Sequence, residues 1–351
     1  MRDRAPRIRD VAAIVGYAPA TVSLALRNHH SIPPKTRERI WAAARKLGYR
    51  PNPLVSALMV SLRSKRPVDR HTVLALVTMH PPGENWRSQR TFAEMSAGAE
   101  RRAAELGYRL AEFALRSPGM TPARFTQMLR TRNIHGLVIN PLPNEEKSVP
   151  LDLSHFAVVG LGASVTEPPI ERVSNDHFQS AVLAIQKCQD LGYRRIGFVI
   201  SQMMSARLEN RWLSGIYLAQ QRLPVSQRVR PLMPTNTADI PGDLPGWFDR
   251  EQPDVVLFGL FALGYQTLFP RSVGLVALSV YDLAGPLTGI FQNSPLVGAT
   301  AVDHIVGRLQ RNSFGSEATA RLHLIAGQWA AGCTAPGPGR RRDVIGAAEL
   351  A

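Results

Sequence analysis

Residues 8–26, IRDVAAIVGYAPATVSLAL, decide the fold of the first part of this chain. Apolar residues recur there at the spacing of one helix face, at Ile8, Val11, Ala12 and Val15. This periodicity predicts a short amphipathic helix. Gly16 then ends the pattern, because glycine readily adopts the positive φ found after a helix. Pro19 suits the first position of a second helix, where its missing N–H is not needed.

The segments that follow complete a small helical domain. A second helix is expected over about residues 19–26, and a third begins near Pro34 and ends at Gly48. The inner face of the third helix carries apolar residues at Ile40, Ala43, Ala44 and Leu47. Three short helices with a glycine-containing turn between the first two are typical of a helix-turn-helix, which we place in residues 1–50. The second helix of such a domain enters the DNA major groove. A helical bundle used for protein contact is the alternative.

The charge distribution agrees with a DNA-binding segment. The chain has 351 residues, a formal net charge of +15 and an isoelectric point near 10.7. Residues 1–66 hold 14 Lys/Arg against 3 Asp/Glu, so most of the excess positive charge lies in the first fifth of the chain. Such a region favours a polyanionic partner. A solvated basic arm is the alternative, but apolar residues at helical spacing are interleaved with these charges.

The rest of the composition argues against other classes of protein. Cys188 and Cys333 lack the spacing of a metal site, so we expect two reduced thiols and no metal or other cofactor. No apolar segment follows the charged first ten residues and no run of 18 apolar residues occurs, which predicts a cytoplasmic protein without a membrane partner. No GxSxG, HExxH or Walker A motif is present, and residues 160–162 (GLG) lack the rest of a dinucleotide fingerprint. An enzyme is therefore disfavoured.

Particular residues at particular spacings point to a family. They are Asp10-Val11-Ala12, Gly16, residues 19–23 (PATVS), Leu26, Thr36-Arg37 and residues 47–52 (LGYRPN). With these segments the chain resembles the lactose repressor (LacI/GalR) family of transcriptional regulators, and the resemblance continues more weakly over nearly the whole chain. It implies an α/β protein in which a helix-turn-helix precedes a periplasmic-binding-protein-like core of two open parallel-sheet subdomains.

The resemblance also implies which residues contact DNA. Phosphate contacts fall to the hydroxyls of Thr21, Ser23 and Thr36. Base contacts fall to Pro19, Ala20 and Leu24, with further contacts from Arg27 and Asn28 at the end of the helix. Phosphate contacts fix the position of the protein on the duplex, whereas base contacts read the sequence.

Two positions of the second helix depart from the family pattern. Leu24 stands where relatives commonly carry an arginine that reads guanine, and Ala18 stands where they commonly carry a capping serine. We therefore expect largely apolar base contacts, for example to thymine methyl groups. No operator sequence can be transferred from relatives.

Residues 51–66 form the linker to the larger domain. Residues 51–53 (PNP) end the helical domain, an apolar segment follows at 54–60, and residues 63–67 are basic. An ordinary core helix is one interpretation. The resemblance implies instead a hinge helix that folds on operator DNA, pairs with its dimer mate in the minor groove and inserts Leu58 into a base step. Ser56 stands where many relatives have arginine.

After residue 70 the sequence alternates between strand and helix patterns. Strands are predicted at 72–78 (TVLALVT), 108–114, 135–140, 156–160 (FAVVG), 195–200 (RIGFVI), 254–258 (DVVLF) and 273–278. Helical patterns lie at 92–106, 122–132, 174–191 and 211–221. Continuous apolar strands that alternate with helices predict two open parallel sheets.

The resemblance divides this region, residues 67–335, into two lobes of an effector-binding and dimerisation domain. Lobe 1 is expected at about 70–163 plus 293–317, and lobe 2 at about 166–291 plus 318–334. The chain would then cross between lobes near residues 163–166, 292 and 318. A last strand is expected at 325–329. Residues 336–351, rich in Pro, Gly and Arg near their start, are expected to form a disordered tail.

Open α/β sheets bind ligands at the carboxyl ends of their strands, and this places the candidate effector residues. They are Trp86 and Phe92 from lobe 1, Arg211, Tyr281 and Asp282 from lobe 2, and Gln292 at a crossover. Each has a structural alternative, as a packed aromatic, a surface or capping side chain, or a backbone-bonding glutamine. The expected effector is a sugar or a related metabolite. Residues 258–261 (FGLF) lack the Asn-Asp that relatives often carry there, so either the ligand is unusual or this pocket no longer senses a typical sugar.

Together these observations predict a homodimeric, effector-responsive regulator that binds a near-palindromic DNA operator, with repression as the leading interpretation. A solute-binding protein or a carbohydrate enzyme with the same core fold are the alternatives.

Overall fold

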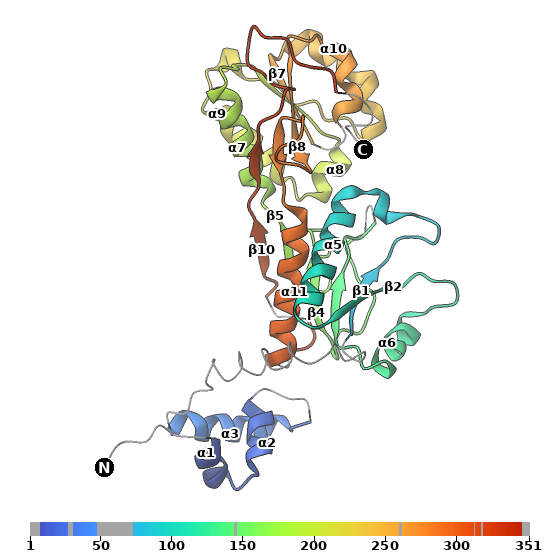
Figure 1. The fold of residues 1–351 in the computed structure, drawn as a ribbon, viewed down its shortest axis with the longest axis vertical. Coiled ribbons are helices and arrows are strands. Elements are labelled where there is room, and N and C mark those ends of the chain that lie inside the picture. The colour runs from blue at the N-terminus through green and yellow to red at the C-terminus, as the bar shows by residue number, and fades with distance from the viewer. Residues whose placement is uncertain are drawn as a thin grey trace.

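The computed structural model describes residues 8–26, 31–47, 73–143, 146–259, 262–311, 313–316 and 319–345. The N-terminal domain consists of α1 (Ile8–Val15), α2 (Pro19–Leu26) and α3 (Pro34–Lys46), as the sequence predicts (Figure 1). Gly16 has φ +74° and its N–H donates to the carbonyl of Ala12 at 2.9 Å, which ends α1. Val11, Val22, Ala25 and Ile40 are fully buried where the three helices meet.

Lobe 1 is built on a six-stranded parallel sheet with the order β10-β5-β4-β3-β1-β2. Its strands are β1 (Val73–Thr78), β2 (Arg109–Ala114), β3 (Gly136–Ile139), β4 (Ala157–Leu161), β5 (Glu171–Asn175) and β10 (Leu322–Ile325). Its helices are α5 (Arg90–Glu105), α6 (Pro122–Thr131) and α11 (Ser294–Arg311). Helices α5 and α11 contribute to the core on one face of the sheet and α6 to the core on the other, which explains why the central strands read as continuous apolar runs.

Helices α5 and α11 lie side by side in unusually close contact (Figure 1). A Cβ atom built on Gly298 would lie 1.8 Å from the carbonyl oxygen of Met95, and one on Gly98 would lie 2.0 Å from that of Pro295. At each of these two positions, any side chain would therefore clash with the backbone of the other helix. This contact sets the position of the N-terminal end of α5, which borders the site described below.

Lobe 2 has a five-stranded sheet with the order β11-β9-β8-β7-β6. Its strands are β6 (Ile196–Val199), β7 (Val255–Phe258), β8 (Gly274–Val280), β9 (Gly289–Phe291) and β11 (Gln328–Ala330). Its helices are α7 (His177–Asp190), α8 (Gln202–Arg207), α9 (Arg211–Gln221) and α10 (Ile240–Glu251). All pairs are parallel except β11 with β9. The predicted two parallel sheets are thus confirmed, with one antiparallel edge strand.

The points at which the chain crosses between lobes differ from the prediction. Only the second crossing, between β9 and α11, lies at residue 292 as expected. The first lies at about residue 176, because residues 171–175 form a strand of lobe 1 that the sequence analysis missed. The third lies at residues 326–327, because the expected single strand at 325–329 is divided between β10 in lobe 1 and β11 in lobe 2.

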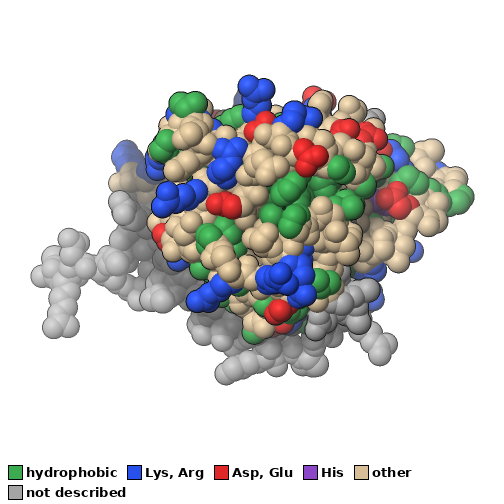
Figure 2. Space-filling model, turned by 90° about the horizontal axis from the view of Figure 1, so that it is seen from above, with side chains coloured by type: hydrophobic (Ala, Val, Ile, Leu, Met, Phe, Trp, Pro, Cys, Tyr) green, Lys and Arg blue, Asp and Glu red, His purple; other side chains and the backbone are tan. Residues whose placement is uncertain are grey.

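The surface of the two lobes is mixed in charge. Residues 67–351 hold 28 Lys/Arg and 24 Asp/Glu. Figure 2, which views the molecule from the lobe 2 end, shows basic and acidic side chains interspersed with hydrophobic ones on that face. Among the described residues no helix is long and apolar enough to cross a membrane.

The expected disordered tail is wrong for residues 336–345, which pack against lobe 2. Arg342 is 1% exposed, and its guanidinium donates to the carbonyl oxygens of Gln266, Phe269 and Val273. Ile345 is buried and exchanges two hydrogen bonds with the Gln266 side chain, at 2.7 and 3.0 Å. The composition of this segment favours disorder, but the segment is ordered because the buried Arg342 donates hydrogen bonds to backbone carbonyls of lobe 2. Residues 346–351 lie outside the described residues.

The Arg342→Ala variant is expected to lower the free energy of unfolding by about 2–4 kcal/mol, because it removes a buried donor from several carbonyls at once. Urea titration measures the change. Arg341 is exposed and adjacent in sequence, so Arg341→Ala is the matched control and should behave as wild type. Equal midpoints for the two variants would show that the segment does not contribute to stability.

Candidate functional site

A cavity of about 100 Å³ lies between the two lobes, at the carboxyl ends of strands from both sheets. The first turn of α5 and the residues after β3 and β4 border it from lobe 1. The start of α7, the helices α8 and α9 and the loop after β8 border it from lobe 2. A molecule in this cavity would contact both lobes.

Three of the six predicted effector residues border the cavity: Phe92, Tyr281 and Gln292. The Tyr281 hydroxyl lies 3.1 Å from Thr91 Oγ1, and the Arg90 guanidinium lies 4.5 Å from the centre of the Tyr281 ring. Tyr281 belongs to lobe 2 and the other two residues to the first turn of α5 in lobe 1. These contacts join the lobes beside the cavity.

Gln292 borders the cavity but already has structural partners. Its side-chain Nε2 donates to the carbonyl of Leu278 at 2.5 Å, and its own carbonyl accepts from Asn175 Nδ2 at 2.6 Å. It therefore holds the crossover between β9 and α11 in place, which is the backbone-bonding alternative considered from the sequence.

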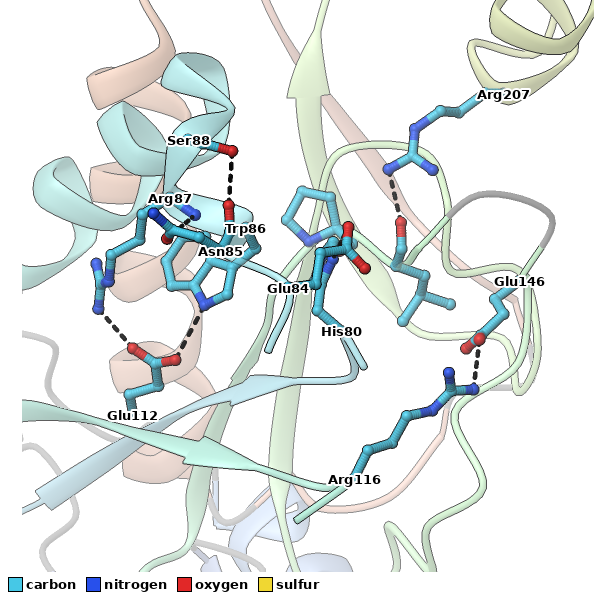
Figure 3. Close-up of polar contacts among 12 residues, drawn as sticks. His80, Glu84, Asn85, Trp86, Arg87, Ser88, Glu112, Arg116, Glu146 and Arg207 are labelled. Carbon is cyan, nitrogen blue, oxygen red and sulfur yellow. Dashed lines mark hydrogen bonds and ion pairs between the residues drawn. The ribbon is translucent and has the colours of Figure 1, made fainter. Parts of the chain in front are cut away.

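The other three predicted residues lie outside the cavity. Trp86 is 5% exposed in the core of lobe 1, where its indole N–H donates to Glu112 Oε1 at 2.9 Å (Figure 3). Asp282 accepts from the backbone N–H of Ala284 at 2.9 Å within a turn. Arg211 donates twice to Glu209 Oε2, at 2.9 and 2.6 Å.

The position next to Arg211 borders the cavity instead. Successive residues of a helix point about 100° apart, so a shift of one position along α9 exchanges a surface side chain for a cavity side chain. Trp212 is 1% exposed and lies against the cavity. The predicted Arg211 therefore lies in the turn of α9 that borders the cavity, but Trp212 is the residue of that turn that lines it.

Arg207, like Arg90, borders the cavity and was not predicted from the sequence. It ends the short helix α8 of lobe 2, and its Nη2 donates to the carbonyl of Leu142 in lobe 1 at 2.6 Å (Figure 3). Its guanidinium also lies 5.6 Å from the centre of the Phe92 ring. Burial lowers the pKa of Arg207 from its ordinary value. The helix α8 was not predicted, so nothing in the sequence marked this arginine.

His177 and Trp212 form a buried pair at the floor of the cavity. Their rings pack edge to face with centroids 4.8 Å apart. Neither His177 Nδ1 nor Trp212 Nε1 has a hydrogen-bond partner within the described parts of the chain, although both atoms are buried. Burial, together with the positive charge of Arg211, lowers the pKa of His177 to about 4, so this imidazole is neutral at pH 7. Both residues border the cavity, so these two atoms are candidates for contact with a ligand.

The pH dependence of stability is expected to reflect His177. Its pKa in the folded chain, about 4, lies below the ordinary 6.5, so the unfolded chain binds a proton more readily as the pH falls through this range. The free energy of unfolding should therefore decrease by about 3 kcal/mol from neutral pH to about pH 4 through this group. Urea titrations across this range should show that contribution lost in His177→Phe and kept in His155→Asn, whose side chain is exposed. A His177→Phe profile parallel to that of wild type would contradict the assignment.

A second polar cluster lies in lobe 1, away from the cavity. His304 Nδ1 and His323 Nε2 lie 2.8 and 2.7 Å from Glu171 Oε1, in an arrangement that could hold a metal ion. Arg308 Nη1 lies 3.5 Å from the second carboxylate oxygen. Burial opposes ionisation of Glu171, but the hydrogen bond from His323 and the nearby charges of His304 and Arg321 outweigh it and lower the pKa of Glu171. The carboxylate is thus already satisfied by protein groups.

The predicted DNA-contact residues are only partly within the described structure. Pro19, Ala20, Thr21, Ser23 and Leu24 all lie on α2. The Thr21 side chain is half-buried on α2. Leu24 also packs against the three-helix core, so less of the Leu24 side chain is available to contact bases. Thr36 is half-buried in the first turn of α3. Arg27, Asn28 and Leu58 lie outside the described residues, as does the whole linker 51–66.

Comparisons with known proteins agree with this architecture. Residues 7–52 match the family "Bacterial regulatory proteins, lacI family". The regulator MalR of Streptococcus pneumoniae is 24% identical over 193 residues, 55% of this chain and 56% of the relative, so the alignment spans about half the length of each. The regulator PtxS of Pseudomonas plecoglossicida is 25% identical over 339 residues, 90% of this chain and 91% of the relative.

A solved structure supports the fold along the chain. The lac repressor dimer bound to operator and the anti-inducer ONPF is 19% identical, with 94% of this chain and 99% of that chain covered and a TM-score of 0.51. The predicted fold class, a helix-turn-helix followed by a two-lobed parallel-sheet core, is therefore confirmed. Residues 7–52 are a lacI-family helix-turn-helix domain, and the resemblance of the chain to lacI-family regulators is confirmed with them.

Proposed function

We propose that this protein is a sequence-specific DNA-binding transcriptional repressor, controlled by a small molecule that binds in the cavity between its lobes. The observation that carries the proposal is the lacI-family helix-turn-helix at residues 7–52, joined to a core with a cavity between its two lobes. The role is regulatory rather than catalytic, and it is exerted in the cytoplasm. Solute binding alone does not account for the N-terminal domain.

The DNA side of the proposal rests on α2. Its inner face, with Val22 and Ala25, is fully buried in the domain core, so Thr21 lies on the part left for DNA. Thr21, Ser23 and Thr36 are proposed to contact phosphates, and Pro19, Ala20 and Leu24 the bases. A homodimer would place two such helices on a near-palindromic operator, as the lac repressor dimer is bound to its operator. Leu58 is proposed to act in the minor groove.

The effector side rests on the contacts that cross between lobes. Arg207 of lobe 2 binds the Leu142 carbonyl of lobe 1, and Arg172 of lobe 1 lies 3.3 Å from Glu209 of lobe 2. These contacts stabilise one relative position of the lobes around the cavity. A ligand that binds more tightly to this arrangement of the lobes than to others shifts the population toward it. The described part of lobe 1 begins at residue 73 and follows the linker in the chain, so a change in the arrangement of the lobes would alter the position of the linker.

Selection of duplexes from a random pool by the purified full chain tests the proposal. Enrichment of a near-palindromic site is expected, because a two-fold symmetric dimer presents two copies of α2. Recovery of duplexes without a shared motif would contradict sequence-specific recognition. Metabolites that change occupancy of the selected site then identify the effector.

A further inference from the structure

The charged side chains that border the inter-lobe cavity are arginines, whereas the neighbouring hollow between the lobes, which shares Arg207, is also lined by Glu146 and Glu209. Arg90 of lobe 1 and Arg207 of lobe 2 border the cavity, and its described lining contains no aspartate or glutamate. Arg90 lies at the first position of α5, where the helix dipole disfavours a cation. Arg90 also forms an ion pair with Glu94 one turn further along α5, with Nε 3.2 Å from Oε1.

The cavity is also rich in hydrogen-bond donors. Trp212 Nε1 can only donate, and it is buried with no acceptor within the described residues. The first turn of α5 borders the cavity, and Gln89 at its N-cap makes no side-chain capping bond. A helix N-terminus presents backbone N–H groups that favour an anion. Trp212 belongs to lobe 2 and the N-terminus of α5 to lobe 1, and both favour a ligand group rich in acceptor oxygens.

The remaining walls suit a carbon skeleton. Phe92, Met95 and Leu208 present apolar surface, while Ser164 and Ser279 supply hydroxyl groups at the border. The cavity volume of about 100 Å³ holds several water-sized groups. This matches a metabolite of roughly monosaccharide size or smaller.

We propose that the effector is a small organic anion. Its carboxylate or phosphate oxygens are held by Arg90 and Arg207 from opposite lobes, and Trp212 of lobe 2 donates a hydrogen bond to it. The proposal rests on the proposed function, since it names the chemical class of that effector. Because each lobe supplies one cation, the anion would favour the lobe position seen here. Carboxylates and phosphates share this acceptor chemistry, and arginine binds both.

Calorimetric titration of the full chain with matched pairs of small molecules tests the role of charge. The pairs are glucuronate and glucose, glucose 6-phosphate and glucose, and glycerol 3-phosphate and glycerol, with inorganic phosphate as the minimal anion. We expect at least one anion to bind at least about tenfold more tightly than its neutral partner, since charge-assisted hydrogen bonds are the stronger ones. The pairs also distinguish a carboxylate effector from a phosphate effector.

Variants locate that binding in the cavity. Arg90→Gln and Arg207→Gln should each weaken the anion by at least about tenfold and bring its affinity toward that of the neutral partner. Arg101→Gln is the matched control, because Arg101 is an exposed residue of α5 away from the cavity, and it should bind as wild type.

Three results would overturn the inference: equal affinity for both members of every pair, anion binding that survives both variants, or no binding of any anion tested. Operator binding by the same preparations without ligand separates the two proposals. If the operator is bound while the cavity prefers neutral sugars, only the anion inference fails. If no operator is bound, the proposed function fails as well.

Discussion

Replacing Thr21 with aspartate is expected to lower operator affinity by about 100-fold or more, because like charges placed together at an interface cost several kcal/mol. Thr21 lies on α2 outside the buried face formed by Val22 and Ala25. Its hydroxyl is proposed to donate to a phosphate, and a carboxylate there would face that phosphate instead. Fluorescence anisotropy with the selected operator measures the loss.

The control for this variant makes the same chemical change elsewhere. Thr121 is exposed at the N-cap of α6, where its hydroxyl accepts from Arg124 N–H at 3.3 Å. Aspartate is also a good N-cap, so Thr121→Asp should keep both the fold and the operator affinity. Thermal unfolding of Thr21→Asp near the wild-type temperature shows that its domain is intact. Wild-type affinity in a folded Thr21→Asp variant would refute the assigned docking face.

The Gly298→Ala variant is expected to lower the free energy of unfolding by about 3 kcal/mol or more, because overpacking against backbone cannot be relieved by a side-chain rotation. The added Cβ would lie 1.8 Å from Met95 O and 2.7 Å from Ala99 N, so α5 and α11 must separate. Since the first turn of α5 borders the cavity, ligand binding should weaken along with stability. Urea titration of the purified protein measures the change.

A second helical glycine supplies the control. A Cβ on Gly242 of α10 would meet no atom within 4 Å. Alanine there replaces a poor helix former with the best one, so Gly242→Ala should be neutral or stabilising by up to about 1 kcal/mol. If Gly298→Ala were as stable as Gly242→Ala, the two helices of lobe 1 would not be packed as closely as described.

The sequence predicts helices and strands well where the hydrophobic pattern fits only one kind of secondary structure. Residues 73–78 and 255–258 are continuous apolar runs because helices cover both faces of their sheets, and such runs are recognised without any partner. The helix-turn-helix is predictable for a similar reason, since its helices, the glycine turn and the proline start are all local signals.

The missed elements depend on distant residues. The strand at 171–175 (ERVSN) is polar, and its buried Glu171 is satisfied by His304, Arg308 and His323, more than 130 residues away in sequence. No local pattern marks such a strand, so the first crossing between lobes was placed too early. The segment at 336–345 is similar, because its order depends on Arg342 reaching carbonyls of lobe 2.

The site was only partly predictable from the sequence, since three of the six predicted side chains border the cavity. Phe92 and Tyr281 were found because they follow strands of the predicted sheets. Arg211 was predicted because it matches a pocket position of the family and can supply charged hydrogen bonds. The helix phase that places Trp212 against the cavity is instead set by packing. The position of Arg207 depends on α8, and this six-residue helix is too short to show a clear hydrophobic periodicity in the sequence.

The most direct test of sequence-specific DNA binding is the affinity of the full chain for its selected site and for a duplex with the same base composition in scrambled order, each titrated at several salt concentrations. We expect an affinity ratio of about 1,000 or more in favour of the selected site, and a log affinity that falls steeply and linearly with log salt. Equal affinity for the two duplexes, or affinity that does not change with salt, would contradict it.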